Sequence, residues 1–273
     1  YELVGQHIKG SRSCIRDGDS MKKNDAVVWF SCGAASAVAG KLAIKKYGDS
    51  VDLVYCDTGG EHESNMVFLH ECEDWYGKKI QILKNSDYID HFDVVRKKKF
   101  ITNQYGFAYC THELKMKMRN DAGYCDSINI FGYTYEEIKR AEKLIAHNID
   151  MTCEFPLIDN AVTKDECLGI IWQQGIKMPR MYELGYSHNN CVGCVKGGIG
   201  YWNRIRVDFP ETFKKMAELE REIGVTTLKH RSGEKEGERM YLDELDPKAG
   251  NMQKDPQISC GIDCHLTIKK FND

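Results

Sequence analysis

The stretch Val27-Val28-Trp29-Phe30-Ser31-Cys32-Gly33-Ala34-Ala35-Ser36 decides the fold of this chain. Its first four residues are bulky and favour a strand, and an alanine-rich segment with helical spacing follows the small residues. The pattern predicts a buried strand, a tight loop and the N-terminus of a helix. Because loop amides and the positive end of a helix dipole attract anions, the loop is a candidate phosphate site. A turn that only packs strand against helix is the alternative interpretation.

The loop matches neither of two common phosphate-binding patterns, Gly-Lys-Ser/Thr and G-x-G-x-x-G. It resembles instead the PP-loop of the adenine-nucleotide α-hydrolase superfamily, Ser-Gly-Gly-x-Asp-Ser. Both serines and one glycine match, and Ala35 stands at the acidic position. The resemblance implies that loop residues hold a phosphate or sulfate of an adenine nucleotide: Ser31, Cys32, Gly33, Ala34 and Ser36.

A second buried strand is predicted over residues 51–56, and it runs into Asp57-Thr58-Gly59. Further strands over 79–83 and 127–131 alternate with helical segments, and this order predicts an α/β fold with a parallel, doubly wound sheet. Ligands of such sheets bind at the carboxyl ends of the strands, where both loops lie. Asp-Thr-Gly also resembles the superfamily, which implies that Asp57, Thr58 and Gly59 line the nucleotide.

Two later segments resemble phosphoadenosine-phosphosulfate (PAPS) reductases and their relatives. Cys110 and Lys115 resemble a cysteine, or a cysteine pair, followed by a basic residue on one helix, and Gly132 ends the fourth strand ahead of a charged helix. The resemblance implies that Lys115 and Arg140 neutralise the charge of the nucleotide near Gly132. An exposed helix with ion pairs, such as Glu136 with Arg140, is the alternative interpretation.

The cysteines form a pattern of their own. Cys191-Val192-Gly193-Cys194 lies in a polar, glycine-rich stretch, and Cys260 and Cys264 form a second close pair. Two close pairs favour a metal site of four thiolates, either a [4Fe–4S] cluster or zinc. In the iron–sulfur reductases that the chain resembles, a position like that of Cys110 also supplies ligands.

Cys260 has two competing roles. Cys260-Gly261-Ile262 resembles the C-terminal motif whose cysteine attacks the sulfur of the sulfonucleotide in these reductases, although Ser259 and Asp263 depart from that motif. A cysteine bound to a metal is not available as a nucleophile, so Cys260 is either a ligand or the catalytic thiol. Cys264 favours the ligand role.

Charge and cysteine content limit the partners. The net charge of −3 does not favour a surface that coats nucleic acid, and no apolar run reaches the roughly 20 residues that span a bilayer. The basic run at 96–99 is expected to be a solvated loop, with contact to phosphate or nucleic acid as the alternative.

Twelve cysteines without an export signal indicate a reducing cytoplasm. Most are expected to be small buried thiols: Cys14, Cys56, Cys72, Cys125, Cys153 and Cys167.

We expect three regions in the 273 residues. Residues 1–20 are an upstream extension or a remnant of cloning, residues 21–185 are the PP-loop-like nucleotide-binding domain, and residues 186–273 are a cysteine-rich region with the metal site. The last region contains an amphipathic helix over residues 210–223.

The resemblance implies a PAPS-reductase-like enzyme of the cytoplasm that binds PAPS, APS (adenosine 5′-phosphosulfate) or ATP and reduces the sulfonucleotide with a thiol reductant protein. Ala35 disfavours ATP pyrophosphatase chemistry, because the acidic residue it replaces usually helps to hold Mg²⁺. Two alternatives stay open. One is an ATP-dependent, iron–sulfur-assisted sulfurtransferase acting on nucleic acid or a small molecule, and the other is a non-catalytic nucleotide-binding module with structural zinc. A homo-oligomer is also left open.

Overall fold

The structure, a computed structural model, describes residues 24–102, 107–230 and 236–252. These residues form two compact units whose segments alternate along the chain. The first contains residues up to 56 together with 64–83 and 117–178, and the second contains 57–63, 84–116 and 179 onward. Each unit has its own hydrophobic core. The expected boundaries at residues 20 and 185 stay predictions.

The first unit is built on a five-stranded sheet with the strand order β3-β2-β1-β4-β5. β1 pairs in parallel with β2 on one side and with β4 on the other, and β4 pairs in parallel with β5. The chain therefore winds outward in both directions from β1, which confirms the predicted doubly wound α/β fold. The strands are β1 Ala26–Phe30, β2 Val51–Asp57, β3 Gln81–Lys84, β4 Ile128–Ile130 and β5 Cys153–Glu154.

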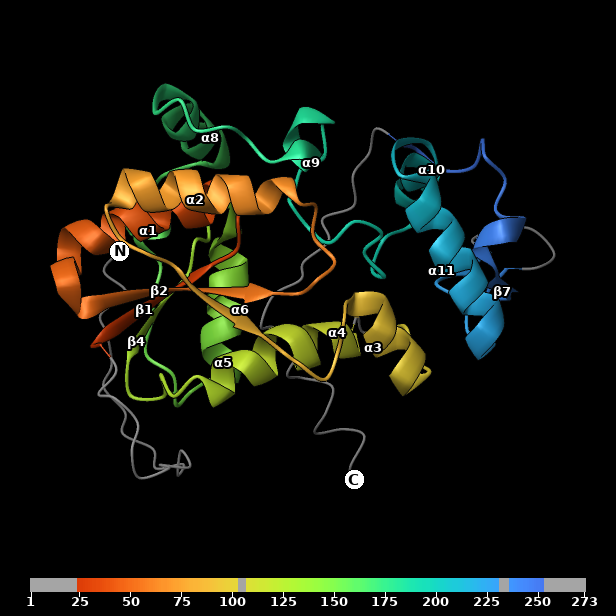
Figure 1. The fold of residues 1–273 in the computed structure, drawn as a ribbon, viewed down its shortest axis with the longest axis horizontal. Helices are drawn as coiled ribbons and strands as arrows, with labels where there is room; N and C mark the ends of the chain where they lie inside the picture. Colours follow the sequence, from red (N-terminus) through yellow and green to blue (C-terminus); the bar gives the residue numbers. More distant parts are fainter. Residues whose placement is uncertain (1–23, 103–106, 231–235, 253–273) are drawn as a thin grey trace. The chain divides into compact units, whose positions relative to one another are not determined.

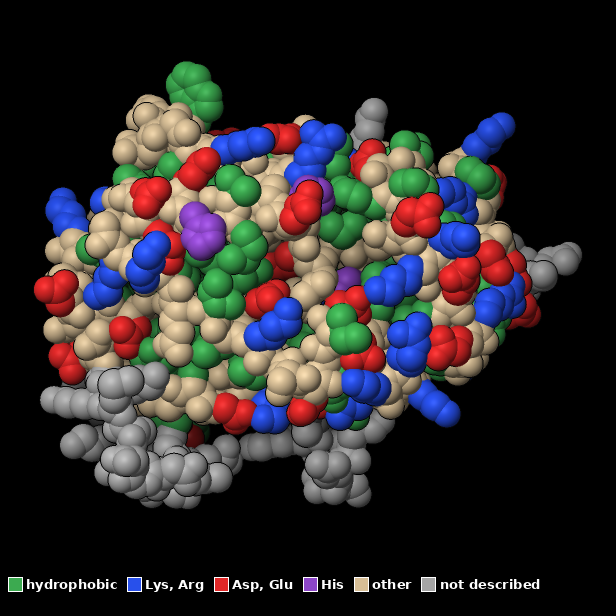
Figure 2. All heavy atoms as spheres, viewed as in Figure 1, with side chains coloured by type: hydrophobic (Ala, Val, Ile, Leu, Met, Phe, Trp, Pro, Cys, Tyr) green, Lys and Arg blue, Asp and Glu red, His purple; other side chains and the backbone are tan. Residues whose placement is uncertain are grey.

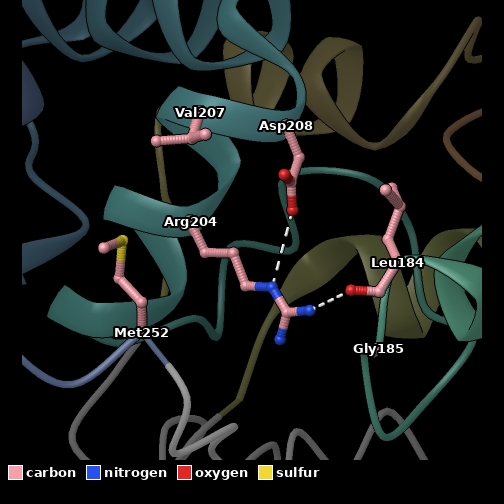
Figure 3. A pocket seen from close by; sticks show the side chains of 6 residues that line it. All are labelled: Leu184, Gly185, Arg204, Val207, Asp208 and Met252. Atoms are coloured by element: carbon pink, nitrogen blue, oxygen red, sulfur yellow. Dashed lines mark hydrogen bonds and ion pairs between the residues drawn. The ribbon is translucent and has the colours of Figure 1, made fainter.

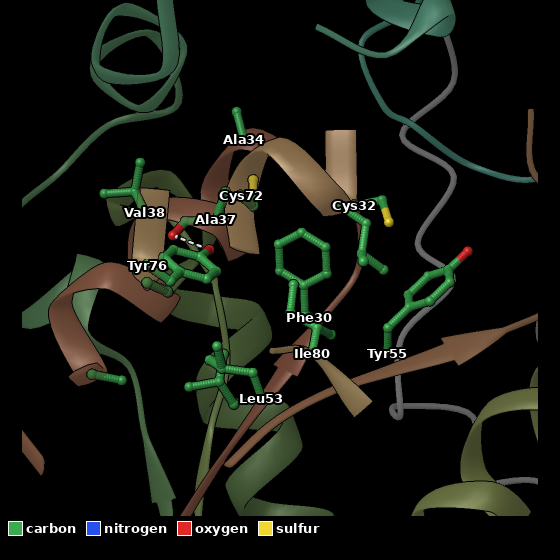
Figure 4. Close-up of a cluster of buried hydrophobic side chains, with 14 of the residues drawn as sticks. Phe30, Cys32, Ala34, Ala37, Val38, Leu53, Tyr55, Cys72, Tyr76 and Ile80 are labelled. Atoms are coloured by element: carbon green, nitrogen blue, oxygen red, sulfur yellow. Dashed lines mark hydrogen bonds between the residues drawn. The ribbon is translucent and has the colours of Figure 1, made fainter. Parts of the chain in front are cut away.

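Helices cover both faces of this sheet (Figure 1). Helices α1 and α2 pack on one face with α8 against α1, and α5 and α6 lie on the other. The core under α1 contains Phe30, which stacks on Phe68 at 6.1 Å. It also contains Tyr76, whose hydroxyl donates to the Ala37 carbonyl at 2.7 Å (Figure 4). The helices of this unit are α1 Ala34–Tyr47, α2 Ser64–Tyr76, α5 Lys117–Asp121, α6 Ile138–His147, α7 Pro156–Asp159 and α8 Lys164–Gln173, with 3-10 turns at Gly48–Ser50 and Tyr135–Glu137.

The second unit is mainly helical. Its core surrounds the fully buried Trp202 and Met216, where α10 packs on α11 and α11 packs on α3. Helix α11 has the bounds predicted from its amphipathic pattern, with Pro210 at its first position and Gly224, at φ +69°, ending it. The elements are α3 His91–Lys98, α4 Tyr109–Thr111, a π-helical turn His112–Met116, α9 Arg180–Glu183, α10 Ile199–Asp208, α11 Pro210–Ile223, a 3-10 turn Leu242–Glu244, and the hairpin strands β6 Leu228–Lys229 and β7 Arg239–Met240.

The basic run at 96–99 lies in the last turn of α3 and at its end, so the expected loop is wrong. Asp90 caps this helix, because its Oδ1 accepts a hydrogen bond from the Asp93 amide at 2.8 Å. Three of the basic side chains make ion pairs: Arg96 with Glu222, Lys97 with Asp93 and Lys98 with Glu113. On the face drawn in Figure 2, Lys and Arg are interspersed with Asp and Glu and form no separate basic patch.

The cysteines expected to be buried differ in their surroundings. Cys72 and Cys167 are fully buried, and Cys56 and Cys153 are half-buried. Cys125 is exposed and disulfide-bonded, so the expectation of a small buried thiol is wrong there. Cys14 lies outside the described residues. Within the described part of the chain, no helix is both long enough and apolar enough to cross a bilayer.

Candidate functional site

The loop after β1, residues 31–36, is organised by one hydroxyl. Ser36 Oγ accepts hydrogen bonds from the amides of Ser31 at 3.1 Å and Gly33 at 3.3 Å, and it donates to the Gly33 carbonyl at 2.9 Å. The Ser31 hydroxyl lies 3.1 Å from the same atom. Ala34, Ala35 and Ser36 begin α1, and amides in the first turn of a helix have no partner within the helix. The loop therefore presents the amides that an anion needs.

Cys32 stands in this loop with a left-handed backbone, at φ +54°. That conformation is strained for a residue with a side chain. The Cys32 side chain is fully buried in the core (Figure 4). Its sulfur lies 3.6 Å from the Asn65 carbonyl oxygen. Cys32 therefore anchors the loop to the core through its side chain, and it can meet a phosphate only through its backbone.

Gly132 comes directly against the loop from the neighbouring strand β4. A Cβ atom at this position would lie 2.5 Å from Ser36 Cα and 2.6 Å from the Ser36 nitrogen. Only glycine fits there without moving the backbone. The two predicted site elements thus meet between β1 and β4, where the strand order reverses and where ligands of doubly wound sheets bind.

Arg140 lies near this junction. Its guanidinium stacks over the ring of Tyr133 at 4.2 Å and pairs with Glu137 at 2.6 Å. The ion pair with Glu137 is of the kind that the alternative interpretation expected, and the Glu136 carboxylate accepts from the Lys164 amide at 3.2 Å. A planar arginine on an aromatic ring keeps hydrogen-bond donors at its edge, which suits recognition of an anionic group.

The remaining predicted nucleotide residues belong to the second unit. Asp57 Oδ1 accepts from the Gly59 amide at 2.8 Å, and Oδ2 pairs with Lys84 at 3.1 Å. Gly59 has φ +64°, and a Cβ atom there would lie 2.0 Å from the Ile89 carbonyl oxygen. The loop after β2, residues 57–60, is therefore a tight turn that needs its glycine.

This loop contacts the cysteine turn, residues 191–194. The Thr58 hydroxyl lies 3.2 Å from Cys191 Sγ, and the Val192 amide donates to the Gly60 carbonyl at 2.8 Å. Because Thr58 Oγ1 already accepts from the Gly60 amide at 3.4 Å, its hydrogen can point to the sulfur. Thr58, expected at the nucleotide, thus contacts a predicted metal ligand.

Tyr201 closes the cysteine turn from the other side. Its hydroxyl accepts from the Cys194 amide at 2.9 Å and donates to the Cys191 carbonyl at 3.2 Å. Tyr201 is buried, and burial raises its pKa well above the usual value, so the hydroxyl keeps its proton. Gly193 takes φ +73° between the two cysteines. The turn is therefore held in one shape by contacts that no local sequence pattern predicts.

Lys115 lies in the π-helical turn. Its Nζ is 3.4 Å from Glu61 Oε1, and the Glu61 side chain is only 4% exposed. π-Helical turns redirect side chains and are frequent at functional sites. Glu61 was not among the predicted site residues. Its position directly after Asp57-Thr58-Gly59-Gly60 is the sequence signal that could have identified Glu61 as a partner of the site.

The described residues supply part of the predicted metal site. Cys191 and Cys194 are both buried at one turn, and their thiols suit zinc or iron. In the part of the chain that the structure describes, no three Cys, His, Asp or Glu side chains are grouped to hold a metal ion, and a role for Cys110 as a ligand stays a prediction. Cys260 and Cys264 lie outside the described residues. The donor chemistry of the turn fits a thiophilic metal, and the described residues provide two of four expected ligands.

The second unit also has a shallow pocket of about 390 Å³ (Figure 3). Arg204 lies in it, stacked on Tyr186 at 3.9 Å, paired with Asp208 at 3.5 Å and bonded to the Leu184 carbonyl. Because these partners already use the guanidinium charge, the pocket has no obvious ligand. The residues lining it are Leu184, Gly185, Arg204, Val207, Asp208 and Met252.

Comparison with known proteins gives one curated relative. The chain is 24% identical over 250 residues to an uncharacterized protein from Methanocaldococcus jannaschii, covering 85% of this chain and 48% of that protein. The chain therefore spans about half the length of the curated relative it matches.

The solved structures that are remotely similar include a reductase and a thiolase. A PAPS reductase from Candida auris in its phosphate complex has a TM-score of 0.44 at 13% identity, covering 60% of this chain and 80% of that one. A U34-tRNA thiolase from Methanococcus maripaludis with its [4Fe–4S] cluster has a TM-score of 0.43 at 14% identity, covering 74% of each chain. Similarity at this level carries no information about the site.

A family model gives the decisive match. The phosphoadenosine phosphosulfate reductase domain matches residues 25–197. The match runs from the start of β1 through the β1 loop, Gly132 and the cysteine turn. The chain belongs to the phosphoadenosine phosphosulfate reductase domain family.

Proposed function

We propose that this chain binds an adenine nucleotide at the β1 loop and carries out sulfur chemistry on it. One observation carries the proposal: Ser36 organises the loop while Gly132 lies against its backbone, which leaves helix amides facing the carboxyl ends of β1 and β4. Membership of the reductase domain family supports adenine nucleotide as the ligand class. Arg140 would neutralise charge on the nucleotide in the first unit, and Lys115 is proposed for the same task.

The reaction we propose is thiol-dependent reduction of a sulfonucleotide. Ala35 at the acidic position of the loop favours this over cleavage of a phosphoanhydride in ATP, for which a carboxylate would help to hold Mg²⁺. The Cys260 thiolate would attack the sulfur of the sulfate group, so that an S–S bond forms, the S–O bond to the phosphate breaks and the nucleotide phosphate leaves. A second thiolate would attack Cys260 Sγ and release sulfite. The two thiols become a disulfide, which supplies the two electrons.

The proposed metal site competes with this role of Cys260. Cys191 and Cys194 would hold a [4Fe–4S] cluster or zinc, and Cys264 with Cys260 would complete the four thiolates. A cluster would supply redox or sulfur-binding chemistry, and zinc would supply a structural link. The preformed cysteine turn supports a metal, and it favours an iron–sulfur-assisted sulfurtransferase as the second candidate function if Cys260 is a ligand.

The test combines binding with product analysis on anaerobically purified protein. Adenosine 3′,5′-bisphosphate is titrated calorimetrically, and sulfite and pyrophosphate are measured after incubation with PAPS, APS or ATP and dithiothreitol. We expect sulfite from a sulfonucleotide, no pyrophosphate from ATP, and loss of sulfite release in Cys260→Ser. Ser36→Ala should weaken binding, while Ser50→Ala, at an exposed serine of the same unit, should not. Pyrophosphate release without sulfite would replace the reductase with the sulfurtransferase.

A further inference from the structure

His91 is a buried histidine that the proposed chemistry does not use. It begins α3 and is 3% exposed, and its ring centroid lies 4.0 Å from that of Phe92 with the two rings tilted by 35°. The ring also lies against the backbone of Gly60, because a Cβ atom on Gly60 would come within 2.0 Å of His91 Nδ1. Its other nitrogen, Nε2, is 3.2 Å from the carbonyl oxygen of Gly193. His91 therefore fills the space between the β2 loop and the cysteine turn of the same unit.

The tautomer of this histidine follows from its contacts. A carbonyl oxygen only accepts, so Nε2 must carry the proton and donate to Gly193. Burial lowers the pKa of His91 to about 4, against an opposing influence of Asp90 and with smaller contributions from Lys215 and Lys115. His91 is accordingly neutral at physiological pH.

The neutral ring leaves one polar atom without a partner. Among the described residues, Nδ1 has no hydrogen-bond partner. An unpartnered buried acceptor costs free energy, and a phenylalanine of similar size would avoid that cost. Phenylalanine would in turn leave the Gly193 carbonyl without this donor, so what the histidine supplies here is its Nε2–H group.

That donor acts on the cysteine turn at Gly193, the residue between the two cysteines with a left-handed backbone. Gly193 has φ +73° and separates the two cysteines, so its carbonyl orientation sets how Cys191 and Cys194 face each other. The same turn is tied by the Val192 amide to the Gly60 carbonyl, on which the His91 ring packs. Loss of the Nε2 bond would leave the Gly193 carbonyl buried without this donor and free the turn to relax.

We propose that His91 is a positioning residue that holds the cysteine turn so that both sulfurs can bind one thiophilic atom. The ligand class is a soft metal ion or another centre that takes two thiolates. This role of His91 adds a supporting residue to the proposed metal site, and its biological meaning rests on that site. The contacts of His91 with Gly193 and Gly60 carry it.

The experiment measures how well the two sulfurs chelate, without relying on a bound metal. Phenylarsine oxide reacts with two thiols to form two As–S bonds, and its oxygen leaves as water with both thiol protons, so nothing is oxidised or reduced. Its dissociation constant for the full chain is measured by competition with a small dithiol. The Cys191→Ser/Cys194→Ser double variant gives the background from the other cysteines.

Three substitutions at His91 distinguish the effect of the Nε2–H donor from the effect of the ring that fills the space. Gln places an amide nitrogen where Nε2 lies, Asn places one nearer Nδ1, and Phe keeps only the ring. We expect His91→Gln to bind the arsenical within about threefold of wild type. We expect His91→Asn and His91→Phe to bind it about tenfold more weakly, as for loss of one buried hydrogen bond. Leu242→Ala, a buried core residue of the same unit, controls for general destabilisation and should leave the constant unchanged.

Several outcomes would overturn the proposal. The proposal fails if His91→Asn and His91→Phe bind the arsenical with wild-type affinity, or if His91→Gln binds it as weakly as they do. It also fails if Leu242→Ala loses as much affinity as those variants, or if the double cysteine variant binds the arsenical as tightly as wild type. Zinc titration of the same proteins tests the metal site separately. If the arsenical pattern holds but zinc and iron do not bind, the proposed metal site fails while the role of His91 stands.

Discussion

Gly132→Ala tests whether the close contact between β4 and the β1 loop creates the nucleotide site. The added Cβ would lie 2.5 Å from Ser36 Cα, which is about 0.9 Å nearer than the 3.4 Å of an ordinary contact. The atoms it meets belong to the backbone of Ser36 and Ala35, so no side chain can rotate away. Either the start of α1 or the end of β4 must move by several tenths of an ångström.

The expected magnitudes follow from this displacement. Overpacking of this kind lowers the free energy of unfolding by about 1–3 kcal/mol. Hydrogen bonds from amides to a charged group contribute about 1.5–3 kcal/mol each, so misdirecting one amide should weaken nucleotide binding at least about tenfold. Calorimetric titration with adenosine 3′,5′-bisphosphate measures the affinity, and urea unfolding measures the stability.

Gly169→Ala is the matched control in the same unit. Gly169 lies in α8, and a Cβ atom there meets nothing within 4 Å. Replacing a glycine inside a helix by alanine should raise the free energy of unfolding by up to about 1 kcal/mol and leave binding unchanged. If Gly132→Ala keeps wild-type affinity and stability, the steric argument is refuted. If it loses stability but keeps its affinity, the nucleotide does not bind at this loop.

Three further predictions concern other parts of the two units. Cys32→Val should lower the free energy of unfolding, measured in urea, by about 2 kcal/mol, because a β-branched residue disfavours φ +54°. Cys72→Val, in a helix, is the control and should lower it by less than about 1 kcal/mol. Equal losses in the two variants would contradict the prediction. The pKa of His91 is about 4 in the folded state against an ordinary 6.5, so the unfolded state binds a proton more readily and acid favours unfolding. The contribution of neutral His91 to the free energy of unfolding is therefore fully present above pH 6.5. It falls by about 3 kcal/mol as the pH drops to 4. His91→Gln should lack this part of the pH dependence of unfolding, and an unchanged profile would show the assignment to be wrong. Anaerobically purified Cys191→Ser should lose bound iron, sulfide or zinc; Cys260→Ser should lose them too if Cys260 is a ligand and keep them if it is the nucleophile.

The elements predicted correctly are those with strong local signals. The bulky run at 27–30 is β1, and the amphipathic pattern at 210–223 is α11 with the predicted bounds. The capping box of α8 is a local signal of the same kind, in which the Thr163 hydroxyl accepts from the Glu166 amide at 3.3 Å. Hydrophobic period and capping residues act within a few positions, so they can be recognised without knowing the tertiary structure.

Helix α3 shows where local reasoning failed. It has eight residues, its apolar positions are Phe92, Val94 and Val95, and its basic end reads like a solvated loop. The signal that could have identified it is the cap, Asp90 followed three positions later by Asp93. A short helix of this kind is held by packing against α11, which no periodicity reveals.

By itself the sequence determined the doubly wound α/β class, the β1 loop and the two cysteine pairs, because strand runs, small-residue loops and close thiols are properties of neighbouring residues. Only the tertiary structure decided that Gly132 lies against Ser36, that Thr58 contacts Cys191 across 133 positions, and that His91 donates to Gly193. Such contacts need two atoms brought to about 3 Å, and that distance is set by how strands and turns far apart in the chain pack. A pattern along the chain indicates on which side of its own helix or strand a residue lies. It does not identify the atom of another element that the residue will contact.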